Sequence, residues 1–369
     1  MTEQRVRIEK LTARDFRNFE RLDVELPGAG LVVIGENGQG KTNLLEAIYY
    51  LQVFRSVRGA RDQDLVRLGA KAFHLSAVVA SASASGISVG FETTSKKKKV
   101  VVDGAVTGRL SDAFGSVPSV MFSPRDIQLV AGGPAERRRF MDLVLALSSR
   151  RYLTALQGYR AALARRNAAL REAARSGDDT SVSVWEPALA QHGATIVTER
   201  AAWVRERAPS FSALTTAIGE TGDSTMSYHS SLSRESDPRQ ALEDALARQR
   251  KHDMRRAMTH SGPHREDLSL ALDGKDLRVF GSAGQQRTAA IALRMLEATT
   301  LREAGGAAPV MLLDDPFAEL DVRRSARILA LLADAGLGQT ILAVPRAGDI
   351  PPELTSLERR TIHAGSIAA

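Results

Sequence analysis

The chain has no cysteine, only two tryptophans, and aromatic residues at 5% of its 369 positions. The lack of cysteine excludes a disulfide framework. No apolar run approaches the roughly 20 residues that span a bilayer, and no basic N-terminal segment precedes an apolar core and cleavage site. These absences lead us to expect a cytoplasmic protein that does not enter a membrane. Hydrophobic residues still make up 43% of the chain, enough for a sizeable core in one large or several smaller domains.

Lysine is also scarce, with nine residues against 41 arginines. The formal net charge is +7 and the isoelectric point is near 9.8, a balance that suits a polyanionic partner. Arginine matches phosphate geometry well, but an arginine-rich composition can also reflect genomic base composition. Charge by itself therefore leaves nucleic-acid binding open.

The character of the sequence changes twice along the chain. Residues 1–135 contain short β-branched runs and one helical pattern, which predict a sheet-rich segment. Across 136–257 apolar residues recur at helical spacing, interrupted by a polar loop at 175–182 and a serine-rich stretch at 227–239. Alternating strands and helices return in 258–369. We therefore predict an α/β domain split by a helical insertion.

Residues 35–42 read GENGQGKT and match the phosphate-loop pattern GxxxxGK[ST]. They follow the apolar run GLVVI and precede a helical pattern, as such a loop requires. The two glycines that the pattern specifies, Gly35 and Gly40, allow backbone N–H groups to point at phosphate oxygens. Lys41 can then reach the outer phosphates, and the Thr42 hydroxyl can bind magnesium.

A second motif, PVMLLDD, ends an apolar strand with Asp314 and Asp315. Two adjacent carboxylates repel each other, so a nearby cation is expected. Asp314 suits a magnesium shell, and Asp315 suits the positioning of an attacking water. An acidic loop that begins the next helix is the alternative interpretation.

A third motif, GSAGQQR, stands at the start of a long amphipathic helix predicted over 284–304. Ser282 and Gly284 bring a hydroxyl and free backbone N–H groups to the positive end of that helix. This arrangement suits an anion, although an ordinary capped helix start has the same pattern.

These three motifs, in this order, resemble those of ATP-binding-cassette ATPase heads. Within that class the chain resembles the RecF family of bacterial DNA replication and repair proteins over residues 7–345. The matching stretches are DFRNFERL, FRSVRGARDQDLVRLG, GGPAERRRFMD, YLTALQGYRAALARRNAAL, SGPHREDL, FGSAGQQR and LLDDPFAELD. The resemblance implies an ATPase head with a mixed sheet and a β-meander lobe, formed by 1–135 and 258–369, and an inserted helical arm at 136–257.

The resemblance also implies a function. It indicates an ATP- and Mg²⁺-dependent DNA-binding protein of recombinational repair, replication-fork maintenance and SOS induction, with RecR and RecO as partners. ATP would drive homodimerisation on single-stranded, gapped or duplex DNA, and weak DNA-dependent hydrolysis would release it. By position, the nucleotide site comprises Gly35, Glu36, Asn37, Gly38, Gln39, Gly40, Lys41, Thr42 and Asn43 of one chain with Ser282, Gly284 and Gln285 of a second. Lys41 and Asp315 are the expected catalytic residues, and Thr42 and Asp314 the expected metal ligands.

The sequence departs from the family pattern in two places. Ala283 replaces a glutamine, which leaves Ser282 and Gly284 intact. Val344 and Pro345 stand where related ATPases carry a histidine or hydroxyl residue facing the γ-phosphate, and neither side chain donates a hydrogen bond. We therefore hypothesise slow hydrolysis.

Other interpretations stay open at this point. An ATPase subunit of a membrane transporter shares the three motifs but gives no reason for a basic helical insertion. A small-molecule kinase leaves GSAGQQR unexplained. Between Arg150 and Arg175 seven arginines face one acid, Glu172, a pattern that fits either DNA contact or a solvated helix face.

Overall fold

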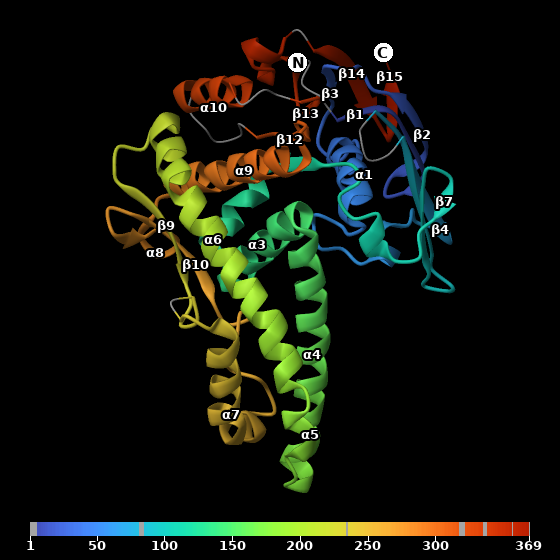
Figure 1. Ribbon diagram of the computed structural model, residues 1–369. Coiled ribbons are helices and arrows are strands. Elements are labelled where there is room, and N and C mark those ends of the chain that lie inside the picture. Colours follow the sequence, from blue (N-terminus) through green and yellow to red (C-terminus); the bar gives the residue numbers. More distant parts are fainter. Residues whose placement is uncertain are drawn as a thin grey trace. The chain divides into compact units, whose positions relative to one another are not determined.

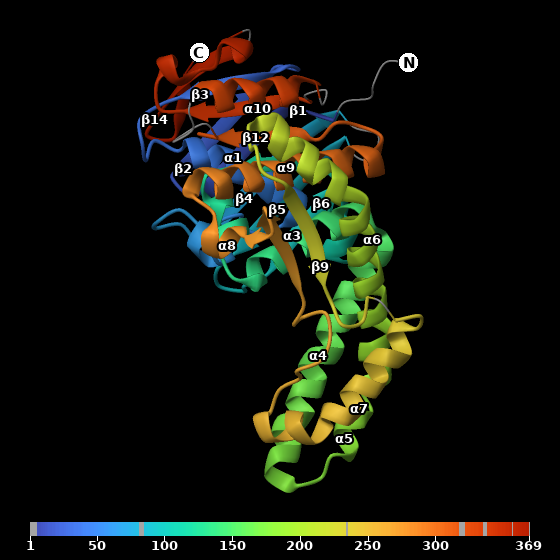
Figure 2. The same cartoon turned by 90° about the vertical axis from the view of Figure 1, so that its left-hand side faces the viewer.

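The computed structural model describes residues 6–80, 85–233, 235–316, 322–334, 338–355 and 357–368. Contacts divide the chain into two compact units (Figures 1 and 2). The first unit comprises Met1–Asp126 with Leu293–Ala369, and the second is Ile127–Ala292. The predicted insertion at 136–257 lies within the second unit, and its independence as a domain stays a prediction. Residues 317–321 of LLDDPFAELD lie outside the described residues. Within 258–369 the sequence also predicts a helix over 325–335, and its last residue, Ala335, lies outside them too.

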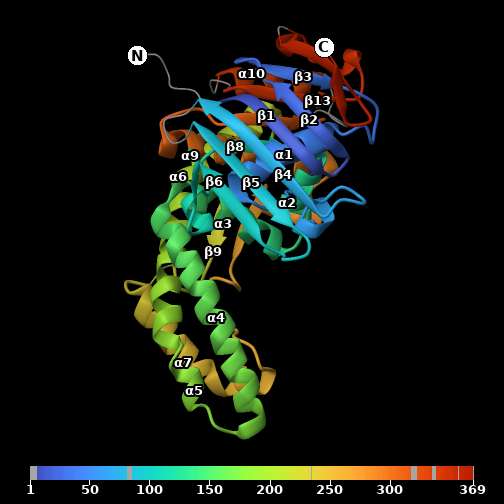
Figure 3. The same cartoon turned by 90° about the vertical axis from the view of Figure 1, so that its right-hand side faces the viewer.

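One sheet of the first unit is an antiparallel meander, seen in Figure 3 in blue and cyan. Its spatial order is β2-β1-β4-β5-β6-β7. Burial alternates along β4, so that one face packs inward and the other meets water. The strands are β1 (Arg7–Phe16), β2 (Phe19–Glu25), β4 (Ala72–Ala80), β5 (Gly86–Glu92), β6 (Lys98–Val102) and β7 (Ala105–Val106).

The second sheet of this unit has the order β15-β14-β3-β13-β12-β8. All its pairs are parallel except β14 with β15. Since parallel neighbours end at the same edge, the loops that follow β3, β13 and β12 meet there. The strands are β3 (Gly30–Ile34), β8 (Ser119–Phe122), β12 (Val310–Asp314), β13 (Thr340–Val344), β14 (Glu358–His363) and β15 (Ser366–Ala368).

Helix α1 (Lys41–Val53) contacts strands of both sheets, including β1 and β4 of the meander and β8, β12 and β13 of the parallel sheet. Eleven of its 13 residues are buried, which explains its weak amphipathic character. The helix predicted after the phosphate loop is therefore the central core element of this unit. A second helix of the unit is α10 (Val322–Asp334).

The second unit is mainly helical (Figure 2). Helices α4 and α6 pack along each other and are joined through α5, and α7 packs on α6. The helices are α2 (Gln128–Ala131), α3 (Pro134–Ser148), α4 (Arg150–Ser176), α5 (Thr180–Ser183), α6 (Glu186–Ile218), α7 (Pro238–Arg256) and α8 (Leu277–Phe280). Helix α9 (Ala283–Gly305) begins in this unit and ends in the first. None of the described helices combines the length and the apolar character needed to cross a bilayer.

A three-stranded antiparallel sheet, β11-β10-β9, completes this unit. It consists of β9 (Ser224–His229), β10 (Asp267–Leu272) and β11 (Lys275–Asp276). The serine-rich stretch expected to be a separator at 227–239 is therefore partly strand. Leu268 and Leu270 of β10 pair with Tyr228 and Met226 of β9, and this long-range pairing outweighs the local turn signal.

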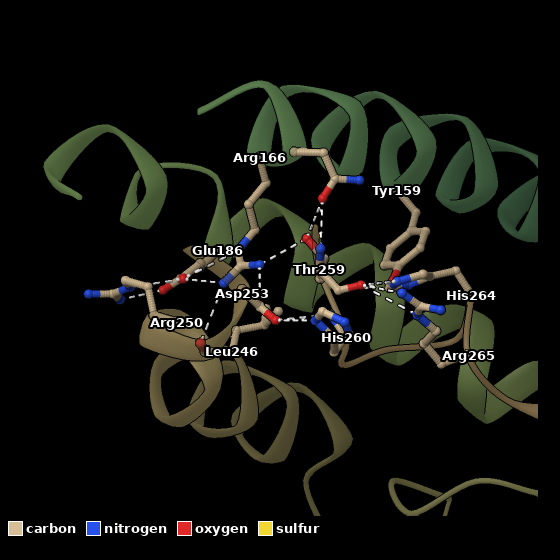
Figure 4. Close-up of polar contacts among 11 residues, drawn as sticks. Tyr159, Arg166, Glu186, Leu246, Arg250, Asp253, Thr259, His260, His264 and Arg265 are labelled. Atoms are coloured by element: carbon tan, nitrogen blue, oxygen red, sulfur yellow. Dashed lines mark hydrogen bonds and ion pairs between the residues drawn. The ribbon is translucent and has the colours of Figure 1, made fainter. Parts of the chain in front are cut away.

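Arg166 forms the centre of a buried polar cluster that ties α4, α6 and α7 together (Figure 4). Its side chain is fully buried and pairs with Asp253 at 2.7 Å and with Glu186 at 3.0 Å. It also donates to the Thr259 hydroxyl at 2.8 Å and to the Leu246 carbonyl at 3.4 Å. The buried guanidinium thus has both charge partners and hydrogen-bond acceptors, as a buried charge requires.

His264 lies beside this cluster and bridges α4 to the following segment (Figure 4). Its Nδ1 accepts from the Tyr159 hydroxyl at 2.6 Å, and its Nε2 donates to the Thr259 carbonyl at 3.0 Å. These roles require the neutral ring. Burial, together with the charges of Arg265 and Arg138, lowers the pKa of His264 from 6.5 to about 4.

We expect this ring to make stability depend on pH. Between pH 6.5 and 4 the unfolded chain binds a proton at His264 that the folded chain does not, so stability falls as pH falls. Allowing for partial exposure, the loss between pH 7.5 and 5 is about 1–2 kcal/mol. The variant His264→Gln retains polar groups but cannot titrate, so it should lack this component. Urea unfolding followed by tryptophan fluorescence at both pH values measures it, and equal pH dependence in the two proteins would contradict it.

Candidate nucleotide-binding site

The phosphate loop connects β3 to α1 and depends on glycine at three positions, of which Gly38 has φ of 83°. Gly40 has φ of 117°, in the left-handed region that side-chain-bearing residues avoid. At Gly35 a Cβ atom would lie 2.5 Å from the Ile362 carbonyl oxygen of β14. The loop therefore curls tightly between neighbouring strands, which leaves Lys41 as the first residue of the helix.

Lys41 folds back over its own loop. Its Nζ donates to the carbonyls of Gly35 at 2.5 Å and Glu36 at 2.9 Å. The side chain is only 7% exposed. Burial lowers the pKa of Lys41, while the charges of Asp314 and Asp315 act in the opposite direction. A buried ammonium with carbonyl partners and two carboxylates nearby can exchange some of these contacts for phosphate oxygens.

Thr42 and Asp314 meet across 272 residues of sequence. The Thr42 hydroxyl lies 3.0 Å from each Asp314 carboxylate oxygen. Burial raises the pKa of Asp314, and the charge of Asp315 raises it too, against the hydrogen bond from Thr42. The negative charge of the Asp314 carboxylate is only partly compensated by its neighbours. This carboxylate and the Thr42 hydroxyl are hard oxygen ligands of the kind that Mg²⁺ prefers. The residues present therefore fit this metal.

Asp315 leaves the strand in a left-handed conformation, with φ of 46°. Its backbone N–H donates to the Ala343 carbonyl at 3.0 Å, so β13 holds the turn in place. Such a conformation is uncommon for residues other than glycine and is tolerated best by aspartate and asparagine. The turn directs the chain away from the sheet at the point where Asp314 and Asp315 lie.

A pocket of about 360 Å³ opens at this edge of the parallel sheet. Its lining includes eight of the residues predicted from the sequence: Asn37, Gly38, Gly40, Lys41, Thr42, Asn43, Asp314 and Asp315. Pro345 lines it as well, at the position where the sequence departs from the family pattern. The remaining members of the loop do not line it. Gly35 and Glu36 supply carbonyls to Lys41, and the Gln39 side chain accepts from the backbone N–H of Ala364.

Arg58 also lines the pocket, and sequence reasoning did not identify it. Its guanidinium donates to Asn43 Oδ1 at 2.5 Å and forms an ion pair with the fully buried Glu46. Burial raises the pKa of Glu46, but hydrogen bonds from Arg58, Arg17 and Ser56 bring it below its ordinary value. Arg58 falls in FRSVRG, within one of the stretches that resemble the family, but its orientation depends on partners in α1. Composition and spacing gave no signal for that orientation.

The third motif lies in the second unit, at the beginning of α9. The Ser282 hydroxyl accepts from the Gln285 backbone N–H at 3.3 Å, and the Gln285 side chain accepts from the Ser282 N–H at 2.8 Å. This reciprocal pair is a capping box. Gly284 stands between them on the first turn, and Ser282 is exposed. An anion that approached this helix end would meet both the hydroxyl and the free N–H groups of the first turn.

The chain is similar to known proteins over most of its length. Residues 7–344 match the family model described as "RecF/RecN/SMC N terminal domain". The DNA replication and repair protein RecF of Frankia alni is 34% identical over 373 residues, which covers 97% of this chain and 98% of that protein. RecF of Myxococcus xanthus is 34% identical and covers 90% of this chain and 89% of its own length.

Solved structures give the same result. A structure of "the recombination mediator protein RecF-ATP in RecFOR pathway" has a TM-score of 0.90 at 27% identity and covers 100% of this chain and 98% of that one. An Smc head domain from Pyrococcus furiosus is similar in fold alone, with a TM-score of 0.56 at 16% identity over 98% of this chain and 95% of that one. The predicted α/β ATPase-head fold class is therefore confirmed. The transporter-subunit alternative is not favoured, and the chain belongs to the RecF family of DNA replication and repair proteins.

Proposed function

We propose that this chain binds ATP with Mg²⁺ in the pocket beside the phosphate loop and uses it to control DNA binding. The observation that carries this proposal is the meeting of Thr42 and Asp314 at 3.0 Å beside the buried Lys41. One loop thereby combines a phosphate-binding cation with oxygen ligands for a metal. A RecF relative of very similar fold is described as a complex with ATP, which supports the same ligand here.

Most of the residues that line the pocket have a proposed task. Lys41 would neutralise the outer phosphates, and Thr42 with Asp314 would hold Mg²⁺, which supplies charge neutralisation when bound. Asp315 would position the attacking water. Arg58, which is restrained by Glu46 and Asn43, adds a second cation on the phosphate side of the pocket. The backbone of Asn37 to Gly40 would complete the phosphate cradle.

We further propose that Ser282, Gly284 and Gln285 of a second copy close the nucleotide site, so that ATP favours a homodimer. The exposed hydroxyl and helix start suit this task. Val279 and Phe280, which stand just before Gly281 and Ser282, are 67% and 69% exposed. Large apolar residues so accessible beside a polar helix start are typical of a contact surface. ATP would act by binding the dimer more tightly than the monomer.

The remaining elements of the proposal rest on the family. They are action on single-stranded, gapped or duplex DNA in recombinational repair, replication-fork maintenance and SOS induction, cooperation with RecR and RecO, and a cytoplasmic location. The RecF relative of very similar fold is a recombination mediator of the RecFOR pathway, which supports this assignment. The basic composition of this chain supports DNA as the polyanion.

Pro345 in the pocket supports the hypothesis of slow hydrolysis. Proline has neither a side-chain donor nor a backbone N–H, so it cannot stabilise charge on a γ-phosphate. We expect a weak, DNA-dependent ATPase whose hydrolysis resets the dimer. Steady-state turnover measured with duplex DNA tests this expectation, and a rate near the roughly 10 s⁻¹ that is typical of enzymes would contradict it.

Anisotropy binding to labelled duplex, gapped and single-stranded DNA tests the function as a whole. The purified chain should bind at least one of these DNAs more tightly with ATP and Mg²⁺ than without nucleotide. Titration at several salt concentrations separates specific from general electrostatic binding. If no DNA bound under any condition, the proposed function would be wrong.

The variant Ser282→Ala should separate dimerisation from nucleotide binding. We expect ATP binding to the monomer to stay within about twofold, and ATP-dependent dimerisation to weaken by about tenfold or more, as loss of a charge-assisted hydrogen bond predicts. Sedimentation with and without ATP measures this. Ser282→Asn is the control because asparagine caps helices as well as serine does. If Ser282→Asn dimerised normally while Ser282→Ala did not, the serine would be only a cap.

A further inference from the structure

The arginines of α4 do not form the open basic stripe that their sequence allows. Arg166 is buried in its cluster, and Arg160 pairs with Asp142 at 3.1 Å. Arg165 lies over the Trp185 ring at 4.9 Å. Further pairs join Arg151 to Glu199 and Arg175 to Glu172, and Arg150 also has a partner. In the part of the chain that the structure describes, Arg171 is the one member of the seven without such a contact.

The two halves of helix α7 differ in how their charges are compensated. In the first half the charges are compensated: Arg239 pairs with Glu243 at 3.1 Å, and Asp244 accepts from Gln240 at 3.0 Å. In the second half the only acid is Asp253, which is fully buried against Arg166. Four exposed cations follow one another there: Arg248, Lys251, Arg255 and Arg256. None of the four pairs with a carboxylate among the described residues.

Three of these residues, Arg248, Lys251 and Arg255, form the basic face of α7, which has a fixed direction. Leu242, Leu246 and Asp253 recur at helical spacing and are fully buried, and Arg248, Lys251 and Arg255 recur on the opposite side. Figure 4 shows the buried side of the helix held by Arg166 through Asp253 and the Leu246 carbonyl. Arg250 pairs at 2.5 Å with Glu186, which also contacts Arg166. The helix cannot rotate its cations away without breaking this cluster.

The attraction between cations and the helix dipole does not account for the whole basic face. Arg255 and Arg256 lie in the last turn, where cations are favoured by the helix dipole. Arg248 and Lys251 lie before that turn, and the dipole effect falls off within it. Like charges three and four residues apart on one helix repel each other, so their repetition without acids disfavours the free helix. A polyanion on this face would remove that repulsion.

We propose that the basic face of α7 binds the phosphate backbone of duplex DNA. Arg248, Lys251 and Arg255 span roughly 10 Å of helix, with a cation about every 5 Å, which suits successive phosphates of one strand. The exposed part of α7 between them has no aromatic residue. Protein–protein contact surfaces are enriched in aromatic residues, whereas DNA interfaces are polar and strongly positive. This inference rests on the proposed DNA-binding function and assigns it a surface.

The test is a triple variant, Arg248→Gln with Lys251→Gln and Arg255→Gln, in the full chain with ATP and Mg²⁺. The matched control is Arg151→Gln with Arg175→Gln and Arg239→Gln, which removes the same charge from exposed arginines that have ion-pair partners. Anisotropy with a labelled duplex at several salt concentrations gives the affinity and the salt slope. Poly-glutamate serves as the probe for an acidic protein partner. Tryptophan fluorescence checks that the second unit is folded, since Trp185 and Trp203 both lie there.

We expect the face variant to bind duplex about tenfold or more weakly, with a salt slope lower by about two to three, while the control changes less than about twofold. Equal losses in both variants would mean that net charge alone matters, and the inference would be wrong. An unchanged face variant with a wild type that binds duplex would overturn the inference but not the proposed function. A loss of poly-glutamate binding without a loss of duplex binding would assign the face to an acidic protein instead. Failure of the wild type to bind DNA would remove the function and this inference together.

Discussion

Lys41→Ala is expected to weaken ATP binding by about a hundredfold or more. Lys41 Nζ already has two acceptors within 2.9 Å in the loop and is buried next to two carboxylates. When triphosphate occupies the pocket, this ammonium is the buried cation placed to neutralise it. Charge-assisted hydrogen bonds contribute about 1.5–3 kcal/mol each, and two of them correspond to a hundredfold or more in affinity. Calorimetric titration with ATP and Mg²⁺ measures the effect.

The control for this variant is Lys71→Ala, which removes the same charge from an exposed lysine outside the pocket. It should leave ATP affinity within about twofold, because screened charges at a distance contribute little. Circular dichroism should show that both variants are folded. An ATP affinity of Lys41→Ala within threefold of the wild type would mean that the pocket does not bind the phosphates as proposed.

Arg166→Ala is expected to destabilise the second unit by about 3–5 kcal/mol, since removal of one partner leaves buried charges uncompensated. Asp253 is fully buried and would lose its 2.7 Å ion pair, although the 2.8 Å contact with His260 would remain. Glu186 would retain Arg250. Thr259 and the Leu246 carbonyl would lose their donor as well. The expected loss of stability therefore comes mainly from the uncompensated charge of Asp253.

Tryptophan fluorescence measures this loss selectively, because both tryptophans lie in α6 or at its start. The urea midpoint for this signal should fall in Arg166→Ala. The matched control is Arg175→Ala on the same helix, where the arginine and its partner Glu172 are 75% and 65% exposed. That change should cost no more than about 0.5 kcal/mol. If the two variants unfolded at the same urea concentration, the buried cluster would not hold α4, α6 and α7 together.

The proposed DNA-binding surface on α7 shows what the charge pattern of the sequence cannot decide. In the sequence, the seven arginines of α4 indicate DNA contact more strongly than the cations of α7 do. In the structure, most of these seven arginines make contacts within the protein. Arg166 pairs with Asp253, 87 residues away, and Arg160 pairs with Asp142, 18 residues away. A pattern of charges on one helix cannot show which of them have partners on another. The tertiary structure buries Asp253 against Arg166, and this leaves Arg248, Lys251 and Arg255 without a carboxylate partner among the described residues.

The phosphate loop could be predicted from the sequence because its geometry is local. Gly35, Gly40, Lys41 and Thr42 lie within eight residues, between an apolar strand and a helix, and the backbone conformation follows from the glycines. The strand that ends in Asp314 could be predicted for the same reason. The meeting of Thr42 with Asp314 could only be implied, because it requires β3 and β12 to flank β13 in one parallel sheet. The order of strands, and with it the position of Arg58 and Pro345 in the pocket, is decided by long-range packing that no local pattern records.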